Sequence, residues 1–275
     1  MAGFRFSQKG SVCCLESTAL AESDFLVHAF CTRREGVSGE GFSSLNFTTR
    51  TGDDPERVKA NWGLLSDAFQ IPPGRFLVVN QVHGDCILTI DSPDFEIPLP
   101  GSVPAEADLS CDAVLTNQPG LAIGVKTADC APIFLVDRVR RVAGVVHAGW
   151  RGTALNIAGK AVGRLGERFS SRPEDILAVI GPAIGPCCYE VDDAVFRSLP
   201  SPSDEASFFR PSGRAGRRML DLPAANRWHL EKMGVPPGNV SSAEICTSCR
   251  EDLFYSHRRD GGRTGRHLNF LMLKP

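Results

Sequence analysis

Residues 121–152 read LAIGVKTADCAPIFLVDRVRRVAGVVHAGWRG and contain three apolar runs, at 121–126, 132–136 and 142–147. The runs are rich in β-branched residues and carry little polarity on either face. Strands of this kind are usually covered on both sides. A helix is expected after them, over 152–169, because apolar residues recur there at helical spacing. The stretch therefore predicts buried strands that pack against a helix.

The flanking sequence mixes further strands and helices without strict alternation. Asp54 and Pro55 are typical of the N-cap and first position of a helix, which we expect to end near Phe69. This mixture favours one mixed α/β or α+β domain over residues 1–275, with 1–23 as an N-terminal extension or edge strands, rather than a Rossmann unit. Further expected elements are strands at 24–31, 76–82, 86–90, 176–180, 240–245 and 267–273, helices at 191–199 and 223–233, and a surface loop at 91–105.

The charge balance excludes a strongly basic nucleic-acid platform. The 275 residues include 30 Lys and Arg against 32 Asp and Glu, a formal net charge of −2, whereas such platforms carry a clear cationic excess. Hydrophobic residues make up 42% and charged residues 23%, which excludes a mainly disordered chain. No window approaches the roughly 18 consecutive apolar residues of a transmembrane helix. We therefore expect neither a nucleic-acid partner nor a membrane association.

Ten cysteines are spaced irregularly, with no repeated disulfide framework. Residues 1–14 lack the apolar segment of a signal peptide, so we expect a cytoplasmic protein whose thiols are reduced. Most of them are then expected to be small buried hydrophobic residues. Cys246 and Cys249 form a single CxxC without a second pair, and Cys187 and Cys188 are adjacent, so we expect partly buried thiols there rather than a zinc ribbon or a redox motif.

Three residues that can bind a metal stand where expected strands end in turns. They are His83 in NQVHGD, Cys130 in KTADCAP and His147 in VVHAGWRG. Their separations match no zinc-finger spacing, but strand ends from one sheet lie side by side, so these residues can converge. Two imidazoles and a thiolate suit Zn²⁺, with copper as competitor, and three protein ligands leave a position for water or substrate.

Two other readings of these residues need no metal. The histidines can be hydrogen-bonded structural residues, or Cys130 can be a nucleophile with His147 as its base. Basic residues beside glycines are candidate anion sites, notably Arg33 and, next to His147, Arg151. Neither the P-loop nor a GxGxxG after a strand occurs, so nucleotide binding through these fingerprints is not indicated.

Read together, these residues resemble the YfiH family, also called the multicopper polyphenol oxidase or laccase-domain family. The resemblance spans residues 28–273, almost the whole chain. The matching motifs are NQVHG at 80–84, KTADCAP at 126–132, HAGWRG at 147–152, GPAIGP at 181–186, SHRRD at 256–260 and TGR at 264–266, with TR at 32–33, GVS at 36–38, SLN at 44–46 and GDDP at 52–55 upstream.

The resemblance implies a single α/β/β/α layered domain with mixed sheets and a zinc held by His83, Cys130 and His147. It implies phosphorolysis of adenosine, inosine, guanosine and methylthioadenosine, together with adenosine deamination. Purine nucleosides and phosphate are then the partners, and the protein is a monomer. Three alternatives stay open: a copper-dependent polyphenol oxidase, a cysteine-type hydrolase that edits peptidoglycan precursors, and a binding module without turnover.

The chemistry of these reactions suggests roles for individual side chains. His83, Cys130 and His147 are expected to be catalytic, with Asp129 or Asp112 as the general acid or base. The expected substrate-binding residues are Arg33, Asn46, Gln81 and Arg151.

One position departs from the family pattern. Glu35 stands where the family has glycine, and a positive φ there would be costly for glutamate. A reshaped loop at this point would also affect the anion site expected at Arg33.

Overall fold

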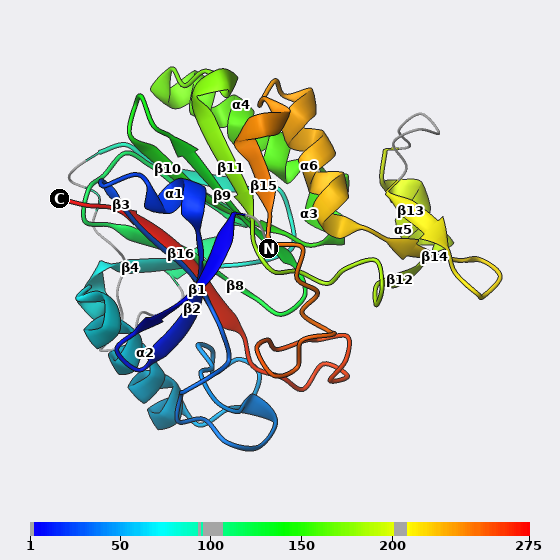
Figure 1. Cartoon of the computed structure of the whole chain (residues 1–275), viewed down its shortest axis with the longest axis horizontal. Coiled ribbons are helices and arrows are strands. Elements are labelled where there is room, and N and C mark those ends of the chain that lie inside the picture. Colours follow the sequence, from blue (N-terminus) through cyan, green and yellow to red (C-terminus); the bar gives the residue numbers. More distant parts are fainter. Residues whose placement is uncertain (1–2, 93–94, 96–106, 201–207) are drawn as a thin grey trace.

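Two large β-sheets run through the computed structural model, which describes residues 3–92, 95, 107–200 and 208–275 (Figure 1). The first sheet has the strand order β1 (Phe4–Lys9), β2 (Val12–Ser17), β3 (Leu26–Cys31), β16 (His267–Leu273), β8 (Ala122–Thr127), β4 (Phe76–Asn80) and β6 (Ala107–Ser110). The second has the order β15 (Val240–Ser242), β11 (Ile176–Ile180), β9 (Ala131–Asp137), β10 (Val142–Ala148), β7 (Ala113–Thr116) and β5 (Ile87–Ile90). Both sheets are mixed, because β4 runs parallel to β6 and β8, β5 to β7, and β11 to β15.

Helices cover the outer faces of the two sheets. Trp62 and Leu65 of α2 (Pro55–Phe69) pack against the first sheet, whereas α4 (Ile157–Phe169) and α6 (Leu222–Lys232) pack against the second. Figure 1 shows α2 and the α4–α6 pair on opposite sides of the molecule. The inner faces of the sheets meet in a core where the ring of Phe30 stacks on that of Phe134, with 4.2 Å between centroids. The predicted α/β/β/α sandwich is therefore confirmed.

The N-terminal residues extend the first sheet. β1 and β2 form an antiparallel hairpin that pairs with β3 at the edge of this sheet, and the short helix α1 (Thr18–Ala21) follows β2. Val12 and Leu15 of β2 are fully buried, so this segment contributes to the core as well as to the edge.

The helix expected over 152–169 is in fact two helices. α3 (Trp150–Ala154) ends before Asn156, whose left-handed backbone (φ 60°) turns the chain into α4. The side chain of Asn156 then accepts a hydrogen bond from the amide of Gly159, as an N-cap does. Apolar periodicity predicts α4 but is insensitive to this break, because the apolar face continues across it.

The expected helix at 191–199 begins instead as a strand. β12 (Glu190–Asp192), β14 (Arg217–Leu220) and β13 (Phe209–Pro211) form a small third sheet, and only α5 (Asp193–Ser198) is helical. These strands are too short to show a period of two. The strand expected at 240–245 ends at Ser242, where β15 loses its partner β11. The expected loop at 91–105 lies largely outside the described residues.

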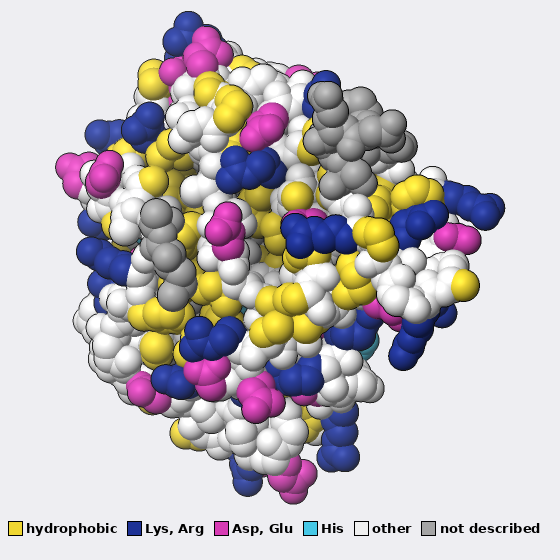
Figure 2. Space-filling view, turned by 45° about the vertical axis from the view of Figure 1, so that its right-hand side comes forward, with side chains coloured by type: hydrophobic (Ala, Val, Ile, Leu, Met, Phe, Trp, Pro, Cys, Tyr) yellow, Lys and Arg dark blue, Asp and Glu magenta, His cyan; other side chains and the backbone are white. Residues whose placement is uncertain are grey.

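The surface carries mixed charge on the face seen in Figure 2, where Lys and Arg side chains are interspersed with Asp and Glu. Among the described residues, no helix combines the length and the apolar character needed to cross a membrane.

Replacing Phe134 with alanine is expected to lower the free energy of unfolding by about 3–5 kcal/mol, because it leaves a cavity between the sheets. Phe134 is fully buried and stacks on Phe30. Phe6 on the edge strand β1 is 39% exposed and provides the matched control. Phe6→Ala should cost less than about 1 kcal/mol. Urea unfolding of both variants checks the expectation, and equal losses would contradict this account of the core.

Candidate metal centre and cavity

A cavity of about 550 Å³ opens where the two sheets meet, and His83, Cys130 and His147 lie on its wall. His83 follows β4 of the first sheet, Cys130 lies in the turn by which the chain passes from β8 to β9, and His147 belongs to β10 of the second sheet. The candidate ligand atoms of all three lie within 4.8 Å of one another. The structure thus brings the three together, although they do not end strands of one sheet.

Asp112 holds both histidines in place. Its fully buried carboxylate accepts hydrogen bonds from the amides of His83 (2.9 Å) and Gly84 (2.7 Å), and it lies 2.8 Å from Nδ1 of His147. The hydrogen bonds from these two amides hold His83 in a left-handed backbone conformation (φ 59°), which is strained for a residue with a Cβ. Donation from Nδ1 of His147 to the carboxylate leaves Nε2 as the nitrogen that can bind a metal. A carboxylate behind a ligating histidine is the usual support of a metal site.

The electrostatics of the group favour a thiolate. Burial raises the pKa of Cys130, but the charge and hydrogen bond of His147, followed by those of His83, outweigh burial and lower it. Burial opposes protonation of His147, whereas the charge of Cys130 and the bond to Asp112 raise its pKa. The pair therefore favours thiolate and imidazolium, and a thiolate is the form of cysteine that binds metals or attacks electrophiles.

The donor set fits a metal ion. A thiolate and two imidazoles are ligands that zinc and copper both accept. Close approach is allowed by Gly149, at which a Cβ atom would come within 2.9 Å of the Cys130 sulfur. His83, Cys130 and His147 could therefore hold a metal, with a fourth position left toward the cavity.

A second part of the cavity wall is cationic. Arg50, Lys126 and Arg266 all line it. Burial, followed by the charges of Arg50 and Arg266, lowers the pKa of Lys126 to about 7. Arg151, stacked on Trp150 at 4.5 Å, lines the same space. A phosphate or carboxylate would be strongly attracted to such a concentration of positive charge.

Of the four expected substrate-binding residues, Gln81 and Arg151 line the cavity. The side chain of Gln81 donates to the carbonyl of Lys126 (2.8 Å) and accepts from its amide (2.7 Å). Gln81 therefore positions Lys126, with both ends of its amide already hydrogen-bonded.

The other two lie outside the cavity lining. Nε of Arg33 donates to the carbonyl of Ser43 (2.6 Å), and its guanidinium stacks on Tyr255. Asn46 is fully buried, and its Oδ1 accepts from the amide of Arg266 (2.8 Å). Arg33 thus braces a loop, and Asn46 supports the backbone of a cavity residue.

Asp129 lines the cavity, but both of its oxygens have donors from the protein. Oδ1 accepts from the hydroxyl of Thr247 (2.6 Å), and Oδ2 accepts from the amide of Arg258 (2.7 Å). Asp129 therefore anchors two C-terminal loops beside Cys130. An acid–base role for it would require one of these bonds to break.

Glu35 does adopt the left-handed conformation, with φ 66°. The backbone at Glu35 therefore has the conformation that glycine adopts most readily. The Glu35 carboxylate accepts a hydrogen bond from Nε2 of Gln8 (2.6 Å), which ties this loop to β1.

The fold and site define a layered α/β protein with a His–Cys–His group on the wall of a cationic cavity. The chain belongs to the multi-copper polyphenol oxidoreductase laccase family, whose model matches residues 27–274. A relative named purine nucleoside phosphorylase YlmD, from Geobacillus stearothermophilus, is 39% identical over 253 residues, 89% of each chain. Human purine nucleoside phosphorylase LACC1 is 33% identical over 265 residues, which cover 91% of this chain and 56% of LACC1. The crystal structure of Bacillus licheniformis hypothetical protein YfiH matches with a TM-score of 0.90 and 35% identity, over 100% of both chains.

Proposed function

We propose that the protein is a zinc-dependent purine nucleoside phosphorylase that acts on adenosine, inosine, guanosine and methylthioadenosine and also deaminates adenosine. The observation that carries the proposal is that the His–Cys–His group and the cationic wall of Arg50, Lys126 and Arg266 line one cavity. A volume of about 550 Å³ is in the range of small-molecule sites and suits a nucleoside with phosphate beside it. The names of the relatives described above support the phosphorylase part of this proposal.

The cationic wall would bind phosphate next to the anomeric carbon of the ribose. In phosphorolysis a phosphate oxygen forms a bond to that carbon while the bond from the carbon to the purine nitrogen breaks. The base leaves with the bonding electron pair and takes up a proton. Lys126, Arg50 and Arg266 would hold the phosphate against the positively charged sugar that develops in the transition state.

His83, Cys130 and His147 would hold the zinc, which when bound supplies a Lewis acid that polarises the leaving purine in phosphorolysis and a water of lowered pKa for deamination. The contact between Asp112 and Nδ1 of His147 would hold the ring in one orientation. Because Asp129 and Asp112 already accept hydrogen bonds from the protein, the proton for the leaving base would come from another group. His257 lines the same cavity and is the candidate for this group.

The test is to measure the zinc content of the protein and then to incubate it with inosine, with and without inorganic phosphate. We expect hypoxanthine and ribose 1-phosphate, formed only with phosphate, and inosine from adenosine in a parallel reaction. Release of hypoxanthine and free ribose without phosphate would instead identify a hydrolase. Copper-dependent oxygen consumption with a polyphenol would support the oxidase alternative. Binding of the nucleoside without any product would reduce the protein to a binding module.

Lys126→Met is expected to raise the KM for phosphate about 10–100-fold, the loss of one charge-assisted hydrogen bond. Because Lys126 has a pKa of about 7, it loses its charge as the pH rises through neutrality. The ratio of the two KM values, variant over wild type, should therefore fall between pH 6 and pH 8. Taking the ratio cancels the titration of phosphate itself. Lys160→Met changes an exposed lysine outside the cavity and should leave the KM unchanged.

The stability of Lys126→Met provides an independent check on the lowered pKa of Lys126. The pKa of Lys126 is lowered in the fold, so the folded chain binds fewer protons than the unfolded chain between about pH 7 and the ordinary lysine pKa. The free energy of unfolding then rises with pH across this window in the wild type, and this rise should be absent in Lys126→Met. Parallel pH curves for the two proteins would show that Lys126 is charged throughout.

We place the enzyme in the cytoplasm as a monomer, acting on small molecules rather than nucleic acid. No disulfide joins any of the ten cysteines, which fits a reducing compartment. Gel filtration of the purified protein checks the oligomeric state.

A further inference from the structure

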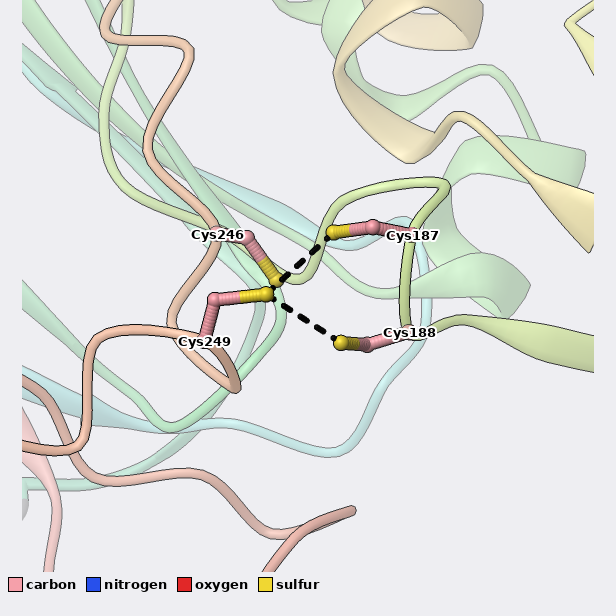
Figure 3. A group of neighbouring side chains, drawn as sticks. All are labelled: Cys187, Cys188, Cys246 and Cys249. Carbon is pink, nitrogen blue, oxygen red and sulfur yellow. Dashed lines mark hydrogen bonds between the residues drawn. The ribbon is translucent and has the colours of Figure 1, made fainter.

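Four cysteines that the sequence treats as unrelated thiols lie together in the structure. Cys187 and Cys188 come from one turn, and Cys246 and Cys249 come from another (Figure 3). Their sulfur atoms all lie within 4.8 Å of one another, with 3.5 Å from Cys187 to Cys249 and 3.4 Å from Cys188 to Cys249. The expectation of partly buried thiols holds for Cys188 and Cys246, whereas Cys187 and Cys249 are exposed.

The spacing of the sulfurs is that of a tetrahedral metal site. A zinc–sulfur bond of about 2.3 Å places the sulfurs of a tetrahedral site about 3.8 Å apart. No disulfide joins the four sulfurs, and they are close enough for all four to reach one ion. Cys187 and Cys249 are exposed and the other two half-buried, so an ion can enter from solvent.

Backbone hydrogen bonds hold the two turns against each other. The amides of Cys188 and Tyr189 both donate to the carbonyl of Gly185 (3.0 Å each), which closes the first turn. The amide of Arg250 donates to the carbonyl of Cys246 (3.1 Å), which closes the second. An isolated β-bridge between Ala183 and Cys246 joins them. The ligand positions are thus fixed by the backbone before any ion binds.

One backbone amide also supports a sulfur directly. The amide of Gly185 donates to the sulfur of Cys246 at 3.3 Å, a contact that stabilises a thiolate. Gly185 is closely packed here, because a Cβ atom on it would lie 3.3 Å from Cβ of Cys246 and 3.4 Å from the sulfur of Cys187.

We propose that Cys187, Cys188, Cys246 and Cys249 bind one Zn²⁺ as a structural site, separate from His83, Cys130 and His147. Each thiol gives up its proton to solvent as its sulfur–zinc bond forms. Four protein ligands leave no position for substrate, so the site is structural.

The ion would link two segments that form part of the cavity wall. Tyr189 directly follows the first cysteine pair, and Arg258 lies beyond the second. The guanidinium of Arg258 stacks on the ring of Tyr189 at 4.9 Å, and it donates to the carbonyl of Glu190 (2.7 Å). Cross-linking the two turns would hold this contact in place on the side of the cavity near Asp129.

Zinc content measured by elemental analysis tests the proposal. Protein prepared with zinc should hold two ions per chain, and both the double variant Cys187→Ser/Cys249→Ser and the single variant Cys130→Ala should hold one. The combined triple variant should hold none. Cys86→Ser removes an exposed thiol outside the cluster and should keep two. Wild-type protein with one ion that is lost in Cys130→Ala would overturn the proposal, and so would a disulfide among the four cysteines of protein purified without reductant.

Cobalt substitution and thermal unfolding supply readouts that do not depend on activity. Cobalt-loaded Cys130→Ala should show the strong sulfur-to-cobalt absorption of a tetrahedral thiolate site, and the triple variant should lack it. Zinc at about 100 times its Kd should raise the Tm of Cys130→Ala by roughly 5–10 °C and leave the triple variant unchanged. Failure of the phosphorylase assay would leave these results unaffected, whereas a Tm of Cys130→Ala that ignores zinc would contradict the site.

Discussion

Cys130→Ala is expected to remove the metal from the cavity and to lower kcat/KM for phosphorolysis about 10³-fold, equivalent to about 4 kcal/mol of transition-state stabilisation. The sulfur is the one anionic donor of the His–Cys–His group. Without it, His83 and His147 remain as two neutral nitrogen ligands, and the charge that holds a divalent ion is lost. Zinc analysis and steady-state kinetics on the same preparation check both parts of the result.

The fold should survive this change, because Cys130 is only half-buried and lies in a turn. Cys86→Ser is the matched control, since it removes an exposed thiol that does not line the cavity. Full phosphorolysis by metal-free Cys130→Ala would end the metal mechanism. The cysteine-hydrolase alternative would be supported by a different pattern. Cys130→Ala would be inactive, and the wild type would form a covalent adduct on Cys130 and keep its activity in the presence of chelators.

The residue types at turn positions are sufficient to predict His83, Cys130 and His147 as a group, but not why they meet. The expected reason is that the ends of strands in one sheet lie side by side. In the structure the chain crosses from the first sheet to the second at Cys130, so the site lies between two sheets. Sequence alone does not reveal such a crossover, because both strands are equally apolar.

The residues that line the cavity beside the His–Cys–His group were harder to predict from the sequence. Motifs favour Arg33 and Asn46, yet their side chains are directed into loop and backbone contacts by tertiary packing. Lys126 offers a signal that could have been used, since it is the one charged residue in the buried run at 121–126. Lysine is almost never fully buried unless it is paired.

The cluster of Cys187, Cys188, Cys246 and Cys249 could not be predicted from local sequence motifs. No local motif joins Cys188 to Cys246, because 57 residues separate them in the sequence. They meet because β11 and β15 run parallel as neighbours, which brings the turns that follow both strands to the same end of the sheet. Only the strand order carries this information, and the short β15 has little pattern from which to predict it.

Asp112→Asn is expected to lower metal affinity about 10–100-fold, as for the loss of other supports behind metal ligands. The carboxylate accepts hydrogen bonds from the amides of Val82, His83 and Gly84 and interacts with Nδ1 of His147. An asparagine of the same shape presents an NH₂ group to some of these donors. Buried donors then lose their acceptor, which should also lower the free energy of unfolding by about 3–5 kcal/mol.

The pH dependence of the free energy of unfolding shows whether the charge of Asp112 matters or only its shape. Burial raises the pKa of Asp112, but the bonds to His147 and to the backbone amides outweigh burial and lower it. A lowered carboxyl pKa means that the stabilisation is present above the ordinary aspartate pKa and is lost as the pH falls through the folded value. The stability difference between wild type and Asp112→Asn should therefore narrow as the pH falls below the ordinary aspartate pKa.

Asp85→Asn provides the matched control, because Asp85 is a partly exposed carboxylate near the same turn that pairs with Lys160 on the surface. Asp85→Asn should leave the metal content unchanged. It should change the free energy of unfolding by no more than about 0.5–1 kcal/mol. If Asp112→Asn kept wild-type zinc affinity while losing only stability, Asp112 would support the fold alone. If zinc affinity fell and added zinc restored kcat, the carboxylate would act through His83 and His147, because it contacts both and lies behind the ligands rather than in the cavity.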